Sequence, residues 1–262
     1  MIIDIHTHAF PNKLAERAIP ALEKKADVKA HLDGRISSLV TSMDRSDIDL
    51  AVVASIATKP SQFQTILAWS EEIRSHRLLP FPSVHPEDKD IEAHLQVIAD
   101  AGFHGIKLHP YYQEFSLDEP RMMKIFRSIE KIGLILLLHT GYDIAYERIP
   151  IADPEKIAGI SHRFPELRMV TTHFGAWEDW DCVEEHLLGK EIYMDTSHSM
   201  QFMGEERVKK FLKTHPKQFV VFGTDSPWGN QAADVERIRT MEMVEADRRL
   251  ILGDNACKLL GL

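Results

Sequence analysis

Two histidines near the start of the chain are spaced as ligands of a single metal ion would be. His6 and His8 follow the apolar run Ile2–Ile5 with one residue between them. Side chains at positions i and i+2 of a β-strand point to the same face, so both imidazoles should converge where this strand ends. Imidazole nitrogens bind zinc and other divalent cations. A His-x-His pair alone is a weak signal, so its weight depends on what the rest of the chain supplies.

Histidines recur at the ends of later apolar runs. In a chain of eight strands, strand ends of about four residues would cover roughly 12% of the sequence. About two of the 14 histidines would then lie at strand ends by chance. We count seven there: His6, His8, His85, His109, His139, His173 and His198. Asp225 follows a further run, Val220–Thr224. This recurrence favours a metal centre over scattered structural histidines.

Short apolar runs alternate regularly with longer mixed stretches along the whole chain. The predicted strands are Ile2–Ile5, Leu50–Ser55, Leu78–Val84, Gly105–Leu108, Leu134–Leu138, Met169–Thr172, Ile192–Asp195 and Phe219–Phe222. The predicted helices are Ile36–Ser46, Gln62–His76, Asp90–Ala101, Glu119–Lys131, Pro154–Phe164, Trp177–Leu188, Glu205–Thr214, Asp234–Met243 and Ala246–Leu260. Nearly all strand residues are apolar, which is typical of a parallel sheet covered on both faces.

Eight such units predict an α/β fold, the (β/α)8 TIM barrel, in one domain over residues 1–262. The catalytic face of such a barrel lies at the carboxyl ends of its strands. An open doubly wound sheet is the main rival. It is disfavoured because the candidate ligands follow strands one, five, six and eight, and only closure brings the first and eighth strands together.

Composition limits the partners. The 262 residues are 44% hydrophobic with a net charge of −9, and no lysine or arginine run stands out, so neither nucleic acid nor a membrane is expected as a partner. The two cysteines, Cys182 and Cys257, form no disulfide pattern. No signal peptide or membrane-spanning run is visible, so we expect a cytoplasmic protein with a small-molecule substrate; assembly into a homo-oligomer stays open.

The ordered set of motifs resembles the metal-dependent hydrolases of the amidohydrolase superfamily. The group it resembles is the amidohydrolase 2 group, which also contains aminocarboxymuconate-semialdehyde decarboxylase. The resemblance covers almost the whole chain. It depends on Asp-Ile-His-Thr-His at residues 4–8, Gly-Ile-Lys-Leu-His-Pro at 105–110, His-Thr-Gly at 139–141, His-Phe-Gly at 173–175, Gly-Thr-Asp-Ser-Pro at 223–227 and the closing Gly-Asp-Asn-Ala at 253–256.

This resemblance implies that His6, His8, His139 and Asp225 bind a divalent metal, with His173 as the acid or base beside it. Nitrogen and carboxylate donors suit zinc, and a bound water would lose its proton near neutral pH. Asp225 would accept that proton, which makes it a catalytic residue as well as a ligand. One metal is expected.

Two further residues on the first and fourth strands leave alternatives open. Lys107 shares the strand parity of His109, and it resembles the lysine that some superfamily members modify to a carbamate bridging two metals. The alternative is an unmodified lysine held by a carboxylate such as Asp4 or by substrate. Asp4 would either orient a ligand imidazole or form a structural hydrogen bond at the barrel floor.

The residues just after the strand ends are candidates for contact with substrate. His109 and Trp228 are the strongest of these, and Arg148 is the one basic side chain near the mouth besides Lys107. His85, Tyr111, Tyr112, Asp143, Trp177 and His198 are weaker candidates.

Three functions are weighed. A metal-dependent hydrolase of a small amide, lactone or ester leads. The alternative is a non-oxidative, metal-dependent decarboxylase of a small carboxylic acid, disfavoured because the chain is compact and few basic residues lie near the mouth. A non-catalytic metal-binding barrel is the third, and a closed metal coordination shell would favour it.

Overall fold

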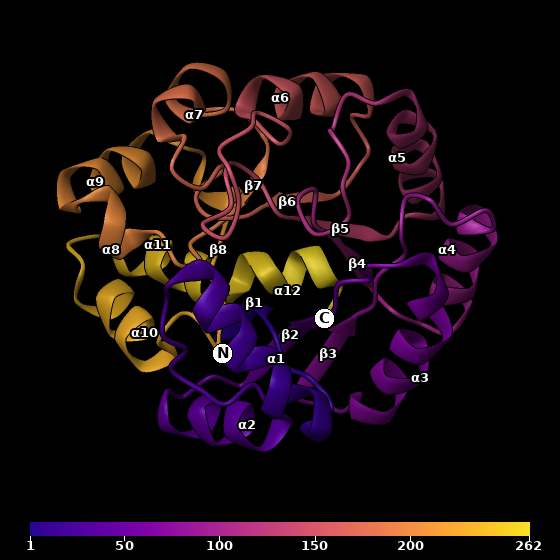
Figure 1. Ribbon diagram of the computed structural model, residues 1–262. Coiled ribbons are helices and arrows are strands. Elements are labelled where there is room, and N and C mark those ends of the chain that lie inside the picture. The colour runs from indigo at the N-terminus through magenta and orange to yellow at the C-terminus, as the bar shows by residue number, and fades with distance from the viewer.

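The computed structural model describes residues 1–262, in which eight strands lie inside a ring of helices (Figure 1). The strands are β1 (Ile3–Thr7), β2 (Leu50–Ala54), β3 (Leu78–Phe81), β4 (Gly105–Leu108), β5 (Ile135–Leu138), β6 (Met169–Thr171), β7 (Tyr193–Asp195) and β8 (Val220–Val221). The α-helices are α1 (Asn12–Ala26), α2 (Ile36–Arg45), α3 (Phe63–Ile73), α4 (Ile91–Asp100), α5 (Pro120–Ile132), α6 (Pro154–Arg163), α7 (Trp180–His186), α8 (Met200–Met203), α9 (Glu205–Thr214), α10 (Gln231–Thr240), α11 (Glu245–Arg249) and α12 (Asn255–Leu260).

All strand pairs are parallel, and two seams close the sheet into the predicted TIM barrel. Strands β1 to β3 and β4 to β8 form two continuous ladders. Between β3 and β4, the Lys107 amide donates to Pro82 O at 2.9 Å. Between β8 and β1, the Ile5 amide donates to Phe222 O at 2.9 Å. Closure therefore places the ends of β1 and β8 side by side, which excludes the open doubly wound sheet.

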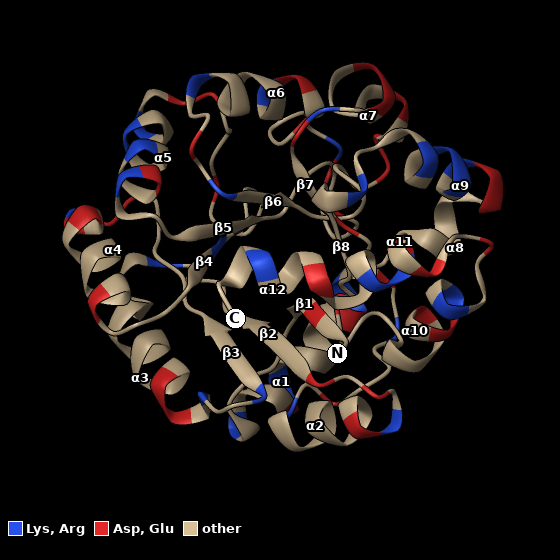
Figure 2. Ribbon diagram, turned by 180° about the vertical axis from the view of Figure 1, so that it is seen from behind, with Lys and Arg blue, Asp and Glu red and all other residues tan.

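Alternate strand residues pack on the two sides of the barrel wall. An inner cluster that includes Ile3, Val52, Leu137 and Val221 continues into Leu259 of α12. A larger outer cluster joins the opposite strand faces to the surrounding helices. Helix α12 lies across the strands on the face seen in Figure 2. It closes that end of the barrel, so the opposite end is left for the site.

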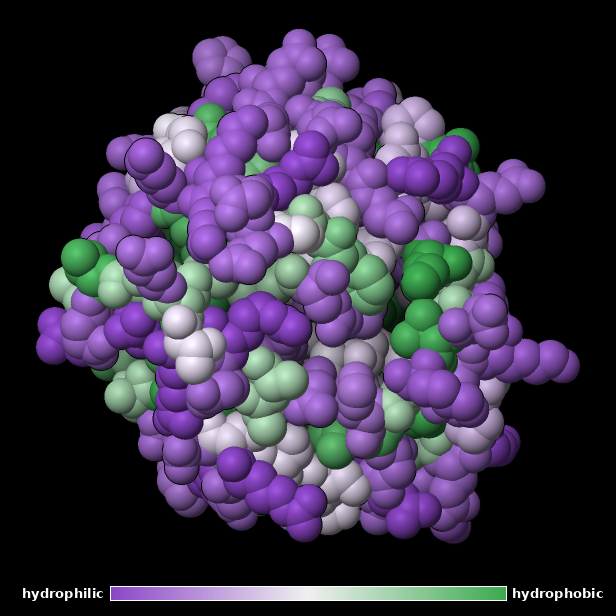
Figure 3. Space-filling view, turned by 90° about the vertical axis from the view of Figure 1, so that its left-hand side faces the viewer, coloured by the Kyte–Doolittle hydropathy of each residue, from purple (hydrophilic) through white to green (hydrophobic).

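The outer surface carries charges of both signs. Lysine, arginine, aspartate and glutamate alternate on the outer helices, while the strands carry few charges (Figure 2). The side with α8, α9 and α10 is mostly hydrophilic, with hydrophobic side chains in small groups (Figure 3). No helix is both long and apolar enough to cross a membrane.

Several predicted elements differ from the structure. Helix α1 was missed because Pro20 lies inside it and is typical of a helix break, and because it buries only Ala15 and Ile19. The short α8 was missed too. The predicted helix Ala246–Leu260 is divided: α11 passes through a π-helical segment, Leu250–Asp254, into α12. Helix α7 starts at Trp180 rather than Trp177, and α10 starts at Gln231, where the Asn230 side chain caps it by accepting from the Ala233 amide.

Gly105 at the β3–β4 seam should tolerate no side chain. A Cβ there would lie 2.5 Å from Ile135 O and from the Phe81 ring. Gly105→Ala should therefore destabilise the protein by roughly 1–3 kcal/mol, the usual cost of overpacking. Gly159→Ala is the matched control, because its Cβ would meet nothing within 4 Å in α6; it should stabilise by about 0.5–1 kcal/mol. Denaturant unfolding measures both, and equal stability of the two variants would contradict a tightly packed seam.

Candidate metal centre

A cavity of about 420 Å³ opens at the carboxyl ends of the strands. Its deep end is lined by polar and titratable side chains that the sequence places after different strands. These are His6, His8, Lys107, His109, His139, Asp143, His173, His198 and Asp225. Its remaining walls are largely apolar. The barrel thus gathers most of the histidines predicted at strand ends into one pocket.

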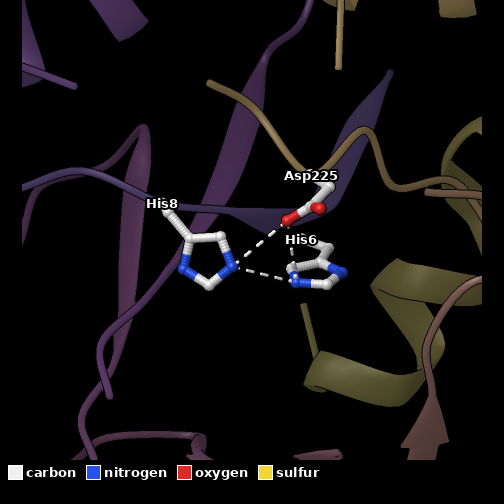
Figure 4. A group of neighbouring side chains, drawn as sticks. All are labelled: His6, His8 and Asp225. Carbon is white, nitrogen blue, oxygen red and sulfur yellow. Dashed lines mark hydrogen bonds and ion pairs between the residues drawn. The ribbon is translucent and has the colours of Figure 1, made fainter. Parts of the chain in front are cut away.

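Three of the four predicted metal ligands meet at this end (Figure 4). His6 Nε2 lies 3.1 Å from His8 Nε2 and 3.4 Å from Asp225 Oδ1, and His8 Nε2 lies 3.2 Å from Asp225 Oδ1. Donor atoms about 2.1 Å from a shared cation lie roughly 3.0 to 3.4 Å apart, depending on the geometry. The three atoms therefore have the spacing that a divalent metal requires.

Hydrogen bonds at the other ring nitrogens orient these two imidazoles. His6 Nδ1 lies 2.8 Å from Asp195 Oδ2, and His8 Nδ1 lies 2.9 Å from Ala54 O. A carbonyl oxygen only accepts, and an ionised carboxylate only accepts, so each Nδ1 carries the hydrogen and each Nε2 keeps its lone pair. Burial, followed by the nearby Lys107 charge, lowers the pKa of His6 well below its ordinary value. His6 Nε2 therefore presents its lone pair, which accepts from Lys107 Nζ at 3.2 Å and would exchange this hydrogen bond for a bound cation.

Asp4 does not orient an imidazole. Its carboxylate accepts hydrogen bonds from Thr224 Oγ1 at 2.6 Å and from Gln231 Nε2, on α10, at 2.9 Å. The prediction assumed strict alternation along β1. However, Asp4 pairs with Ala51 and Thr7 with Val53, so β1 contains one extra residue and its alternation is broken. Asp4 therefore forms structural hydrogen bonds, which was the second of its two predicted roles. The residue that orients His6 is Asp195, to which no role was assigned from the sequence.

Asp225 is positioned by the β1–β8 seam. Its amide donates to His6 O at 2.8 Å, and its backbone is left-handed with a φ of 61°. Such a φ is uncommon outside glycine and often marks functional sites. Burial alone would raise the pKa of Asp225, but His6, His8 and His173 hold it well below its usual range. The carboxylate is therefore ionised and available as a ligand.

His139, the fourth predicted ligand, lies in a second group with His109 and Asp143. His109 Nε2 is 3.3 Å from Asp143 Oδ2, and the two imidazoles stack with ring centroids 4.0 Å apart. His139 Nδ1 faces His173 Nε2 at 3.2 Å. Both groups could hold a cation, and they share one pocket.

The contact between His139 and His173 requires a positive charge or a proton between the rings. His139 Nε2 is 3.1 Å from Tyr142 O, and His173 Nδ1 is 3.0 Å from Ser197 O. Both outer nitrogens must donate to these carbonyls, so both inner nitrogens present lone pairs to each other. Burial lowers the pKa of both histidines, which favours uncharged rings whose two inner lone pairs can accept a cation or a proton. The pair can thus carry a proton or help to hold a cation.

Lys107 is fully buried beside the first group. Its Nζ donates to His6 Nε2 at 3.2 Å, and it forms no ion pair with any carboxylate. Of the alternatives left open for Lys107, the one in which a carboxylate such as Asp4 holds it is therefore not what the structure shows. Burial lowers the pKa of Lys107 to about 8, against the opposing attraction of Asp225, Asp195 and Asp143. Whether charged or neutral, this amine can donate a hydrogen bond to an anionic group of a ligand in the cavity.

Some of the residues predicted to contact substrate line the cavity, and others lie outside it. His109 and Trp228 line the cavity, as do the weaker candidates Tyr112, Asp143, Trp177 and His198. Arg148 does not: its guanidinium stacks on Tyr142, donates to Glu178 O and is mostly exposed. The loop after β5 carries it outside the mouth, which sequence position alone did not show. His85 and Tyr111 also lie outside the lining.

Comparisons with known proteins agree with this fold. The family profile described as amidohydrolase matches residues 3–262. A curated 2-amino-3-carboxymuconate-6-semialdehyde decarboxylase from Dictyostelium discoideum is 21% identical, covering 99% of this chain and 91% of that protein. The solved 2,6-dihydroxybenzoate decarboxylase from Rhizobium has a TM-score of 0.69 at 18% identity, covering 99% and 98% of the two chains. A 5-carboxyvanillate decarboxylase from Novosphingobium aromaticivorans with bound manganese has a TM-score of 0.73 at 14% identity, covering 100% and 97%.

These relatives correct the leading functional prediction. The sequence favoured hydrolysis because the chain is short and carries few basic residues near the mouth. The curated relative is a decarboxylase that matches along nearly its full length, and the characterised neighbours named above are decarboxylases as well. Compactness was therefore a poor guide to the reaction, and hydrolysis is rejected. The family itself was identified correctly: this chain is a member of the amidohydrolase family.

Proposed function

We propose that this protein is a metal-dependent, non-oxidative decarboxylase of a small carboxylic acid. The observation that carries the proposal is the convergence of His6 Nε2, His8 Nε2 and Asp225 Oδ1 at the bottom of a cavity that also contains Lys107. The full-length similarity to a decarboxylase supports the same reaction. His173 and Asp225 both line the cavity, which argues against a non-catalytic metal-binding barrel.

The metal would be held by His6, His8 and Asp225, with His139 as the proposed fourth ligand. Nitrogen and oxygen donors of this kind suit zinc and also manganese, which a structural neighbour contains. One metal is proposed. A second, with Lys107 as a carbamate, would need a modified lysine. When bound, the metal supplies positive charge that attracts the substrate carboxylate and stabilises negative charge on substrate oxygens.

The residues around it would provide the proton that the reaction consumes. Loss of carbon dioxide breaks one carbon–carbon bond and leaves the electron pair on the substrate carbon, which then takes up one proton. His173 lines the cavity with its Nε2 3.2 Å from His139 Nδ1, so His173 is the proposed donor, while His139 Nδ1 would be the nitrogen left for the metal. Asp225 is the second group that can carry a proton beside substrate, and His109 and Trp228 would contact the substrate body.

Metal content tests the first part of this proposal. His6→Ala and Asp225→Ala should each lose most of the roughly one divalent metal per chain, because each change removes one of the three donors that meet at His6, His8 and Asp225. His162→Ala, on the exposed end of α6, is the control and should keep its metal. Elemental analysis after growth with zinc and manganese measures the content. Absence of metal from the unmodified protein would refute the site.

Asp195 should set the affinity for that metal without binding it. Asp195→Asn keeps an oxygen for the Ser197 and His173 amides but turns an N–H group towards His6 Nδ1. The imidazole would then lose its preferred tautomer, and affinity should fall about 10- to 100-fold, the usual effect of losing such an outer partner. Competition with a chelator measures the affinity. An unchanged affinity would show that Asp195 does not orient His6.

The reaction itself is tested by release of carbon dioxide from a panel of small carboxylic acids. The panel should include 2,6-dihydroxybenzoate, 5-carboxyvanillate and 2-amino-3-carboxymuconate 6-semialdehyde. Release should require metal. His173→Asn should keep the metal and reduce the rate roughly 100-fold or more, and its pH profile should lose one limb because an amide does not titrate. His162→Asn is the control. No release from any acid by the metal-loaded protein would refute decarboxylation of these classes.

A further inference from the structure

The cavity has a second half that the proposed chemistry does not use. Of its 30 lining residues, 15 are hydrophobic, and these dominate the part away from the metal donors. Helix α1 and its flanking residues form one wall, and α3 forms part of the facing wall. The side chains that matter here are Phe10, Leu14, Leu22, Val28, Ile66 and Trp69.

The α3 wall is built by helical spacing. Thr65, Ile66 and Trp69 lie on neighbouring turns of one helix face, so they face the cavity together. On the other side, Leu14 of α1 is 43% exposed, and Ile144, after β5, is 52% exposed; both border the cavity. Apolar side chains left open to water in this way have surface that an apolar ligand would cover.

Charge is confined to the deep end. Apart from histidines, the only charged residues in the lining are Lys107, Asp143 and Asp225. A carboxylate can therefore be received beside Lys107, whose buried amine has no carboxylate partner in the protein. A second carboxylate in the outer half would meet no lysine or arginine among the lining residues, because the nearby Lys25 of α1 lies outside the lining with its Nζ over the Tyr146 ring. Burying an unpaired charge is costly.

The volume also exceeds what a single ring needs. A cavity of about 150 Å³ holds benzene, whereas this cavity measures about 420 Å³. Pockets of roughly 300–1,000 Å³ are typical of sites for larger ligands. The extra space lies beside α1 and α3, where uncharged side chains line it.

We infer that the substrate is a monocarboxylic acid whose carboxylate faces Lys107 and the metal donors, while an extended, uncharged apolar group lies between α1 and α3. The placement of the carboxylate rests on the proposed function, whereas the apolar subsite rests only on the residues that line the cavity. Helix α1 is then the element that determines specificity.

Binding of unreactive probes tests this inference in metal-loaded protein. Calorimetry with benzoate and biphenyl-4-carboxylate should show about 10- to 100-fold tighter binding of the biphenyl acid, from the added apolar area that is buried. Biphenyl-4,4′-dicarboxylate should bind at least tenfold more weakly than the monoacid. Equal affinities for benzoate and the biphenyl acid, or preference for the diacid, would overturn the inference.

Variants locate the effect. Leu22→Asp should abolish the preference for the biphenyl acid and leave benzoate affinity within about twofold, which also shows that the variant is folded. Val97→Asp, on α4 outside the cavity and 42% exposed, should change neither. Lys107→Met should weaken both probes to a similar degree. A biphenyl preference that survives in Leu22→Asp would overturn the assignment to α1.

The outcomes separate this inference from the proposed reaction. Binding needs no turnover, so a protein that prefers the biphenyl acid but releases no carbon dioxide from any acid keeps the subsite and loses the decarboxylase function. Conversely, release of carbon dioxide without the biphenyl preference keeps the function and refutes the apolar subsite.

Discussion

The contact between β1 and the segment after β8 determines the geometry of the site. Asp225 and His6 are far apart in sequence, yet the Asp225 amide donates to His6 O at 2.8 Å and the Ile5 amide to Phe222 O at 2.9 Å. These bonds form only when the barrel closes. A ligand set divided between the first and last strands is therefore assembled by the fold itself, which holds the donors to the narrow spacing that a metal needs.

This seam also explains the buried polar network beneath the site. Asp4 accepts hydrogen bonds from Thr224 and Gln231 between β1, the loop after β8 and α10, while Gln231 Oε1 has no partner. Burial raises the pKa of Asp4 to about 7, although hydrogen bonds from Gln231 and Thr224 oppose the shift. A buried carboxyl group is tolerated here because both of its oxygens accept hydrogen bonds, and removing one donor would leave a carboxyl oxygen less well satisfied. On the metal side, burial keeps His6 neutral, so a metal ion would not have to displace a proton from it.

Much of this arrangement could be predicted from the sequence, for reasons that also explain the errors. Strand ends meet on one face of a closed barrel, so residues such as His8 and Asp225 were brought together by topology alone. The broken alternation of β1 could not be seen, because an extra residue in a strand leaves no mark on an apolar run, and Asp4 was misread as a result. Helix α1 was missed because Pro20 inside it suggested a helix break, although Leu14, Ala18 and Leu22 lie four residues apart and form one apolar face. Loop direction was equally hidden, which is why Arg148 was expected near the mouth.

Two histidines and an aspartate on a metal serve hydrolysis and decarboxylation alike, so these donors alone could not choose between the reactions. The surroundings of the donors distinguish the two reactions. Hydrolysis needs a water held and activated at the metal. Decarboxylation turns a localised carboxylate charge into neutral carbon dioxide and a more dispersed charge, and a site with few water molecules and fixed polar groups favours that change. In the proposed reaction, the apolar walls beside α1 and α3 would displace water and bury the substrate body, while His173 would supply the proton needed at the end. Substrate selection and proton delivery would thus fall to different residues of the same cavity.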